Sequence, residues 1–183
     1  MNIILASSSP RRRQMLEEIG LDFSVVHPRY EEDNTVSKEP AELVKIHSLE
    51  KARSVKGDIV IGSDCVVYDG EILGKPKDAD DIRKTLRRLS GKKHTVFAGV
   101  AVIHDGKEYV DHDTAEVEFD KLSDEMIEAY IESGEPFGKA GSYKMHGKGS
   151  LFVKRVCGDH FSVIGMPLFK LVRILHKIGV KII

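Results

Sequence analysis

Short apolar runs and longer amphipathic stretches alternate at the start of the chain. Residues 2–6 form an apolar run that is typical of a buried strand. Ser9 and Pro10 follow as the start signal of a helix, which is expected to end before Gly20. The apolar positions within residues 21–28 predict a second strand. The chain is therefore expected to open with a strand, a helix and another strand.

Residues 39–57 have helical periodicity. The predicted buried face consists of apolar residues that recur every three positions, at Leu43, Ile46, Leu49 and Ala52. The apolar run at residues 58–64 then predicts a strand that ends at Ser63 and Asp64. A hairpin is expected next, because Asp-Gly at residues 69–70 is a strong turn signal.

The rest of the chain continues the alternation of strands and helices. A second Asp-Gly pair at residues 105–106 predicts a long hairpin. The remaining elements are expected in this order: a helix at 78–90, a capped helix at 123–133, an aperiodic glycine-rich loop at 135–150, strands at 151–158 and 161–165, and a helix from Pro167. This order predicts an α/β fold with a mixed sheet and flanking helices. Residues 1–183 are expected to form a single domain, with a division into two lobes near residues 76–90 as the alternative.

Composition excludes several classes of protein. The chain has 28 Lys and Arg residues against 29 Asp and Glu residues, and its net charge of -1 argues against a protein that coats nucleic acid. Cys65 and Cys157 lack the spacing of a disulfide framework or a zinc site. No apolar run suits a membrane span or a signal peptide, so we expect a cytoplasmic protein with no membrane or nucleic-acid partner.

The first predicted helix carries positive charge where the helix dipole favours an anion. Free backbone N–H groups at a strand-to-helix junction attract anionic ligands, and Ser7 and Ser9 add hydroxyl donors. The forked guanidinium groups of Arg11 and Arg12 suit phosphate oxygens. The segment therefore predicts a phosphate site, with a solvated basic helix face as the alternative.

Carboxylates form a second candidate group. Asp64 is expected at the carboxyl end of a buried strand, where ligands of α/β sheets bind, and it could accept a proton from water or hold a cation. The alternative is a turn residue that caps its own backbone. Glu31 and Glu32 lie on an acidic loop, which suits either Mg²⁺ or Mn²⁺ beside a phosphate or a plain solvated surface.

Two lysines and a histidine complete the candidates. Lys75 is held between a glycine and a proline, whereas Lys51, on a predicted helix, could simply be solvated. His94 begins a predicted strand, where a lone histidine is more often structural than catalytic. No Ser/His/Asp or Cys/His set is evident. Charged groups with a metal and without a protein nucleophile favour attack of water on a phosphorus centre.

Five segments occur in an order that resembles the Maf family of nucleoside triphosphate pyrophosphatases. They are LASSSPRRRQML, GSDCVV, LGKP, LSGKKHTV and the paired GKAGSYKMHGKGSLFV and GDHFSVIGMPL, and they extend from Leu5 to Leu168. The resemblance implies a Maf/ITPase-like α/β enzyme of the cytoplasm with a nucleotide cleft between two lobes, often a homodimer. It also implies hydrolysis between the α and β phosphates, which gives the monophosphate and pyrophosphate, with a divalent cation.

The resemblance assigns roles to individual residues. Asp64 matches the family's proton acceptor. The substrate contacts of the family fall on Arg11, Arg12, Lys51 and Lys75. The family's glutamate after the second strand falls on Glu31, with Glu32 adjacent, so these two residues and Asp64 are the expected metal ligands.

Three positions bear on the choice of base, and all three are expected to contact the substrate. Family members that prefer dTTP and UTP resemble GADT and GYxIQG, and the differing positions here are Cys65 and His146. Arg11 agrees with this pyrimidine branch, because the branch that prefers a methylated guanine nucleotide has Trp there. Neutral histidine offers one donor and one acceptor, in a different geometry from glutamine. We expect pyrimidine triphosphates, with broadened or modified-base tolerance as the alternative.

Two other functions compete with the enzyme hypothesis. A nucleotide-binding regulator of cell division with little turnover would fit the family's link to septum formation, but it has no need of a water-activating carboxylate at Asp64. A nucleic-acid binder could use the arginines of residues 9–13 and 83–88, but the chain lacks net basic charge. The residues therefore favour the enzyme.

Overall fold

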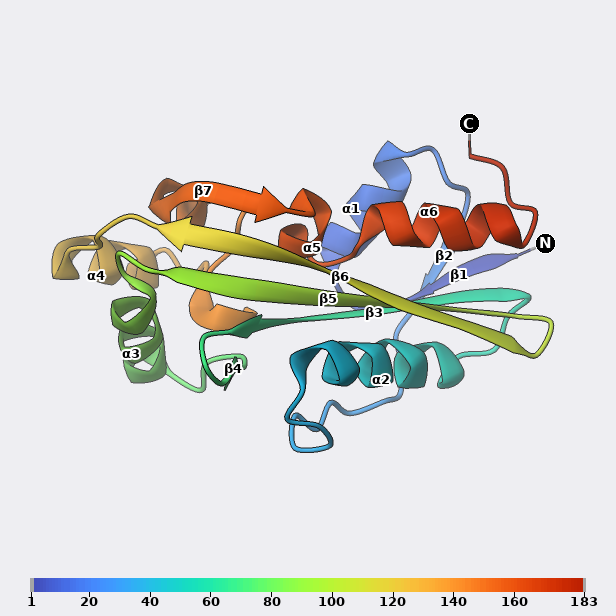
Figure 1. Cartoon of the computed structure of the whole chain (residues 1–183), viewed down its shortest axis with the longest axis horizontal. Coiled ribbons are helices and arrows are strands. Elements are labelled where there is room, and N and C mark those ends of the chain that lie inside the picture. Colours follow the sequence, from blue (N-terminus) through green and yellow to red (C-terminus); the bar gives the residue numbers. More distant parts are fainter. Residues whose placement is uncertain (1, 183) are drawn as a thin grey trace.

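A seven-stranded mixed sheet with helices on both faces forms the frame of the protein, as the computed structural model of residues 2–182 shows (Figure 1). The strands are β1 (Ile3–Ala6), β2 (Ser24–Val26), β3 (Ile59–Tyr68), β4 (Ile72–Leu73), β5 (Lys93–His104), β6 (Lys107–Phe119) and β7 (Val153–Gly158). The α-helices are α1 (Pro10–Glu18), α2 (Pro40–Arg53), α3 (Ala79–Leu89), α4 (Asp124–Glu132), α5 (His160–Ile164) and α6 (Leu168–Lys177). The mixed α/β fold with flanking helices expected from the sequence is confirmed.

The sheet combines parallel and antiparallel strands in the order β2-β1-β3-β5-β6-β7, with β4 paired to β3. β1 runs parallel to both β2 and β3, and the remaining pairs are antiparallel. The two expected hairpins are present. At the tip of the longer one, Asp105 and Gly106 both have positive φ, as the expected two-residue turn requires. No helix within residues 2–182 has the length and apolar character that crossing a membrane requires.

Two apolar clusters lie along the same long strands. One packs α1 and α6 against β1, the start of β3 and the end of β5, and it includes Leu16 and Leu171. The other packs α3 and α4 against the opposite ends of β3 and β5, and it includes Leu86 and Phe119. Because β3 and β5 contribute to both clusters, the strands connect the two ends of the molecule. The single domain over residues 1–183 stays a prediction, as does its division near 76–90.

Helix α2 lies unusually close to the sheet, on the face opposite α1 and α6 (Figure 1). Gly62 and Gly99 make this possible, because a Cβ at either position would collide with the backbone carbonyl of Ser48 or Val44. The buried face of the helix differs from the expected one, since Ile46 and Leu49 are only partly buried. It consists instead of Pro40, Leu43, Val44, His47, Ser48, Lys51 and Ala52. Polar side chains are thereby carried into the interior.

Two expected strand assignments are wrong. β3 does not end at Asp64 but continues to Tyr68. The reason is that residues 63–68 pair with β5 in the same way as the apolar residues 59–62 do. Residues 160–164 form the short helix α5 and not a strand. The carboxylate of Asp159 accepts from the backbone N–H of Ser162, and this N-cap outweighs the strand preference of so short an apolar run. The other expected helices and the glycine-rich loop are confirmed, with η1 (Ala140–Ser142) and η2 (Lys148–Phe152) as 3-10 turns inside that loop.

Candidate active site

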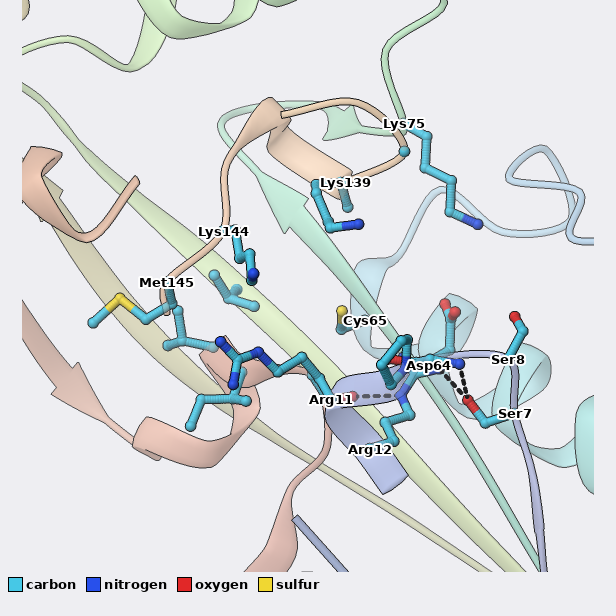
Figure 2. Close-up of a pocket in the computed structure, with 18 of the residues that line it drawn as sticks. Ser7, Ser8, Arg11, Arg12, Asp64, Cys65, Lys75, Lys139, Lys144 and Met145 are labelled. Carbon is cyan, nitrogen blue, oxygen red and sulfur yellow. Dashed lines mark hydrogen bonds between the residues drawn. The ribbon is translucent and has the colours of Figure 1, made fainter. Parts of the chain in front are cut away.

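A cavity of about 710 Å³ brings together eight separate parts of the chain. Its walls come from the β1–α1 junction, the loop after β2, α2, the middle of β3, the loop after β4, β5, the glycine-rich loop and the end of α5. Figure 2 shows Lys75, Lys139 and Lys144 on one side of the cavity, with Ser7, Arg11 and Arg12 on the other. Among the described residues that line it, Lys and Arg outnumber Asp and Glu six to two. The site therefore favours a polyanion.

The β1–α1 junction forms a polar pocket at one end of the cavity. Ser7 and Arg12 are both buried, and Arg12 Nη1 lies 3.5 Å from Ser7 Oγ. Arg12 Nε donates to the carbonyl of Gly165 at 2.8 Å, which fixes the guanidinium across the cavity floor. Ser9 occupies the N-cap position of α1, but its hydroxyl makes no cap hydrogen bond. Because the first N–H groups of a helix have no partner within the helix, this junction can bind an anion.

Arg11 reaches in a different direction from Arg12. Its Nη2 donates to the backbone carbonyl of His146 at 2.8 Å, and its Nη1 donates to Gln14 at 3.0 Å. The guanidinium thus links α1 to the glycine-rich loop across the cavity. Of the two expected phosphate contacts, Arg12 lies by the serines and Arg11 by the loop.

An ammonium group joins two carboxylates at the centre of the site. Lys51 Nζ lies 2.6 Å from Asp64 Oδ1 and 2.7 Å from Glu32 Oε1, and it also donates to the carbonyl of Ser63. Lys51 and Asp64 are only 4% and 5% exposed, so this pair is shielded from solvent. Lys75 Nζ contacts the second oxygen of Glu32 at 2.9 Å. Four charged groups from four segments are thereby connected.

Glu32 keeps its negative charge in this cluster. Burial by itself would raise the pKa of the carboxyl, but the ammonium groups of Lys51 and Lys75 outweigh that effect and hold the pKa at about 2. Glu31, the other acidic residue expected to hold a metal, is exposed and is not part of the cavity wall. The loop after β2 thus presents the second of its two glutamates to the site.

Asp64 occupies a different position in the sheet from the one its sequence context suggested. It lies in the middle of β3, paired with Gly99, and not at the carboxyl end of its own strand. The neighbouring strand β1 ends at Ala6, which pairs with Gly62. Asp64 therefore lies just beyond the carboxyl end of β1, and that end forms the site.

The donor set of the cluster fits a divalent cation that is shared with a phosphate ligand. Asp64 and Glu32 supply hard oxygen atoms close to each other, as their common partner Lys51 shows. Within residues 2–182 there is no group of three or more His, Cys, Asp or Glu side chains placed to hold a metal. Mg²⁺ is commonly held by one or two carboxylates together with substrate phosphates, so two carboxylates are enough for that arrangement.

The glycine-rich loop and Cys65 also line the cavity. Burial raises the pKa of the Cys65 thiol, which keeps it protonated. Burial, and next the charge of Arg11, lowers the pKa of His146, which favours its neutral form. Cys65, His146 and Arg11, the three positions expected to select the base, all line the same cavity.

Sequence reasoning missed several cavity residues, among them Tyr30, Lys139 and Lys144. The two lysines had a usable signal, because they lie in the aperiodic loop that holds several glycines. Tyr30 had none, since its role depends on a contact with α2. His94 is buried, and its Nε2 lies 3.0 Å from Tyr143 Oη. His94 does not line the cavity, which agrees with a structural role.

The matching family model and the similar sequences indicate the same family. Residues 2–178 match the family described as Maf-like protein. The dTTP/UTP pyrophosphatase of Ruminiclostridium cellulolyticum is 45% identical over 190 residues, which cover 100% of this chain and 98% of that protein. Proteins of the same name from Alkaliphilus oremlandii and Methanosarcina barkeri are 47% and 44% identical, over 96% and 98% of this chain and 95% of each relative. Among solved structures, the Ham1 protein of Staphylococcus aureus is 18% identical, with a TM-score of 0.47 over 65% of this chain and 72% of its own.

Proposed function

The chain belongs to the Maf-like protein family, and from this premise we propose that it is a nucleoside triphosphate pyrophosphatase acting on pyrimidine nucleotides such as dTTP and UTP. The observation that carries the proposal is the buried Asp64 beside Lys51 in a cavity that is otherwise rich in cations. Such a site can hold a triphosphate and activate water next to it.

The cationic groups would bind the triphosphate. Arg12 and the serines at the start of α1 supply donors at one end, and Lys75 supplies a charge from the other side. Guanidinium groups and helix N-termini both favour phosphate oxygens. Holding the polyanion in this way places its α phosphorus near Asp64 and neutralises the charge that repels a nucleophile.

Asp64 would act as the general base. Its carboxylate is paired with Lys51. Phosphate oxygens offer Lys51 another anionic partner, which leaves Asp64 available to accept a proton from water. The oxygen of that water attacks the α phosphorus, the bond between this phosphorus and the bridging oxygen breaks, and pyrophosphate leaves. A divalent cation held by Asp64 and Glu32 would add neutralisation of the phosphate charge.

The base would lie toward the glycine-rich loop. Cys65, His146 and Arg11 all line the cavity, and Arg11 contacts the loop at the carbonyl of His146. A neutral imidazole offers one donor and one acceptor, which suits the carbonyl and N–H groups of a uracil or thymine edge. Tolerance of modified pyrimidines is the alternative. A homodimer and a cytoplasmic location, both implied by the family resemblance, also stay predictions.

A substrate panel tests the proposed function. Normal and modified triphosphates are incubated with Mg²⁺ or Mn²⁺, and pyrophosphate and orthophosphate are measured separately. We expect pyrophosphate as the first product, with dTTP and UTP preferred. Orthophosphate as the first product would mean cleavage at another bond. Nucleotide binding without turnover would instead support a regulatory role.

An isosteric change tests the role of Asp64. Asp64→Asn keeps the shape of the side chain but removes the basic carboxylate, so we expect kcat to fall by about 10²- to 10⁴-fold. Asp80→Asn is the control, because the side chain of Asp80 is 91% exposed on α3. Full turnover by Asp64→Asn would exclude Asp64 as the base.

A further inference from the structure

A buried imidazole lies on α2 one turn before Lys51, and the proposed mechanism does not use it. His47 is fully buried. Its Nδ1 lies 2.8 Å from Tyr30 Oη, and its Nε2 lies 3.3 Å from Asn34 Oδ1. The Tyr30 ring also packs on the imidazole, with 5.6 Å between the ring centroids. Both ring nitrogens are therefore bound to the loop that follows β2.

The two partners of His47 lie on either side of Glu32 in the sequence. Tyr30 precedes Glu32 by two residues and Asn34 follows it by two. This loop has no regular secondary structure of its own between β2 and α2. The Asn34 amide also faces Gly74, since its Nδ2 lies 3.3 Å from where a Cβ on Gly74 would be. One imidazole thus holds the chain before and after the glutamate that contacts Lys51 and Lys75.

We propose that His47 is a positioning residue that fixes Glu32 against Lys51 through Tyr30 and Asn34. Its kinetic consequence rests on the proposed function of the site. His47 and Lys51 are four residues apart, so they project from the same face of α2. The helix that carries the central ammonium therefore also carries the group that aligns its carboxylate partner.

The chemistry of the three side chains suits this role. Asn34 Oδ1 is only an acceptor, so Nε2 of His47 carries the proton and Nδ1 accepts from the Tyr30 hydroxyl. This assignment requires a neutral ring. Burial lowers the pKa of His47, and the charge of Lys51 adds to that effect against the opposing carboxylates of Asp64, Glu32 and Asp33.

Glu32 gains from such support because one of its two ion pairs is exposed to solvent. Its side chain is 30% exposed and that of Lys75 is 59% exposed, so this pair contributes little to holding Glu32 in one geometry. The other contact is the 2.7 Å pair with the buried Lys51. Anchoring the loop at two points removes conformational freedom that the ion pairs would otherwise have to overcome.

Substitution of the imidazole provides the first test. His47→Leu removes both hydrogen bonds. We expect kcat/KM for dTTP to fall on the order of tenfold or more, as is found when residues that orient a metal ligand are replaced. Hydrogen exchange of amides 30–36 should become faster. His47→Gln keeps one acceptor and one donor, so it should restore most of both readouts. Ile127→Val, on α4 and not part of the cavity wall, controls for lost stability.

A double-mutant cycle decides whether His47 acts through Glu32. If it does, His47→Leu has almost no further effect on kcat/KM in a Glu32→Gln background. Independent, multiplying effects of the two changes would overturn the proposal, and so would unchanged hydrogen exchange in His47→Leu. Should His47→Leu not fold, Asn34→Ala carries the same cycle, because Asn34 is exposed and is not part of the cavity wall.

Failure of the proposed function would be recognised separately. If the wild-type protein released no pyrophosphate from any triphosphate, the enzyme assignment would be wrong, and kinetics would not bear on His47. The positioning role of His47 would then be tested in the wild type, His47→Leu and His47→Gln. The two measurements are hydrogen exchange of residues 30–36 and calorimetric binding of tripolyphosphate. Equal exchange and equal affinity in all three would overturn it.

Discussion

Arg12 and Arg13 are adjacent in the sequence but differ in burial and in their contacts. Arg12 is 8% exposed and donates to the carbonyl of Gly165, whereas the side chain of Arg13 is 62% exposed and pairs with Glu17 on the surface. The difference arises from the turn of α1, which directs one side chain to the cavity and the next to solvent. Surface ion pairs of the second kind contribute little to stability.

Substituting each arginine by lysine tests this difference. Lysine keeps the charge but loses the planar fork, so Arg12→Lys cannot keep both the contact to Gly165 and a contact to a phosphate. We expect KM for dTTP to rise by about 10- to 150-fold, because a hydrogen bond to a charged group contributes about 1.5–3 kcal/mol and 1.4 kcal/mol is a factor of ten. Arg13→Lys should leave KM unchanged. Steady-state kinetics measures both, and an unchanged KM in Arg12→Lys would contradict the assignment.

His94 makes stability depend on pH. Burial lowers the pKa of its imidazole to about 4 from the usual 6.5. Between these values the unfolded chain takes up a proton that the folded protein does not, so stability present above pH 6.5 is lost as the pH falls toward 4. The slope from this group is at most about 1.4 kcal/mol per pH unit.

Urea denaturation between pH 7.5 and 4.5 measures this slope. His94→Leu should be less stable at pH 7.5, since Tyr143 loses its partner, yet its stability should fall less steeply on acidification. His176→Gln is the control, because His176 is exposed on α6. Equal slopes for His94→Leu and the wild type would refute the prediction.

At the scale of elements, α2 carries much of the site. Its face toward the sheet presents His47 and Lys51, and the close contact over Gly62 and Gly99 brings Lys51 to Asp64. The helix ends and the periodicity of α2 follow local rules, but its separation from the sheet is set by two glycines on different strands. The residues that determine where α2 begins and ends are thus different from the residues that determine how closely α2 packs on the sheet.

Adding one methyl group at this contact should move α2. Gly99→Ala introduces a Cβ that would collide with the backbone carbonyl of Val44, so the helix must shift. We expect a loss of about 1–3 kcal/mol in the free energy of unfolding, as for other overpacked sites, together with reduced kcat. Gly57→Ala is the matched control, because its Cβ meets only the flexible side chain of Ile4 and that of Val60. Denaturation and kinetics check both effects, and wild-type values for Gly99→Ala would rule out this contact as a determinant.

At the scale of the whole molecule, continuous strands link two apolar clusters. β3 and β5 run through both, and Asp64, Cys65 and Val67 of β3 line the cavity (Figures 1 and 2). If either cluster unfolded, β3 and β5 would lose packing, and the other cluster would lose the support of these two strands. The site therefore depends on both ends of the sheet.

This arrangement predicts a single cooperative unfolding transition. Urea unfolding followed by circular dichroism and by hydrogen exchange of Leu16 and Leu86, one from each cluster, should give coincident midpoints. Leu16→Ala and Leu86→Ala should both shift the one transition, by about 2–5 kcal/mol each. Two separate transitions, each sensitive to only one substitution, would instead indicate two independent lobes.

Local sequence rules predicted most elements of this protein, and together with the family resemblance they named most of the charged residues that line the cavity. Cap signals and Asp-Gly turns act over a few residues, so α1, α3, α4 and both hairpins followed from the sequence. The wrong assignment of α5 arose because a five-residue segment with three apolar side chains fits a strand or a helix equally well. Arg11, Arg12, Lys51 and Lys75, the charged residues expected to contact phosphate, all line one cavity.

Only the tertiary structure decided how these groups are paired. Which of Glu31 and Glu32 faces the cavity, that Lys51 lies between two carboxylates, and that His47 anchors a loop all depend on contacts between distant segments. Hydrophobic periodicity specifies which face of an element is buried, but it carries no information on which buried polar group meets which. That choice follows from the distance between α2 and the sheet, which two glycines on separate strands allow.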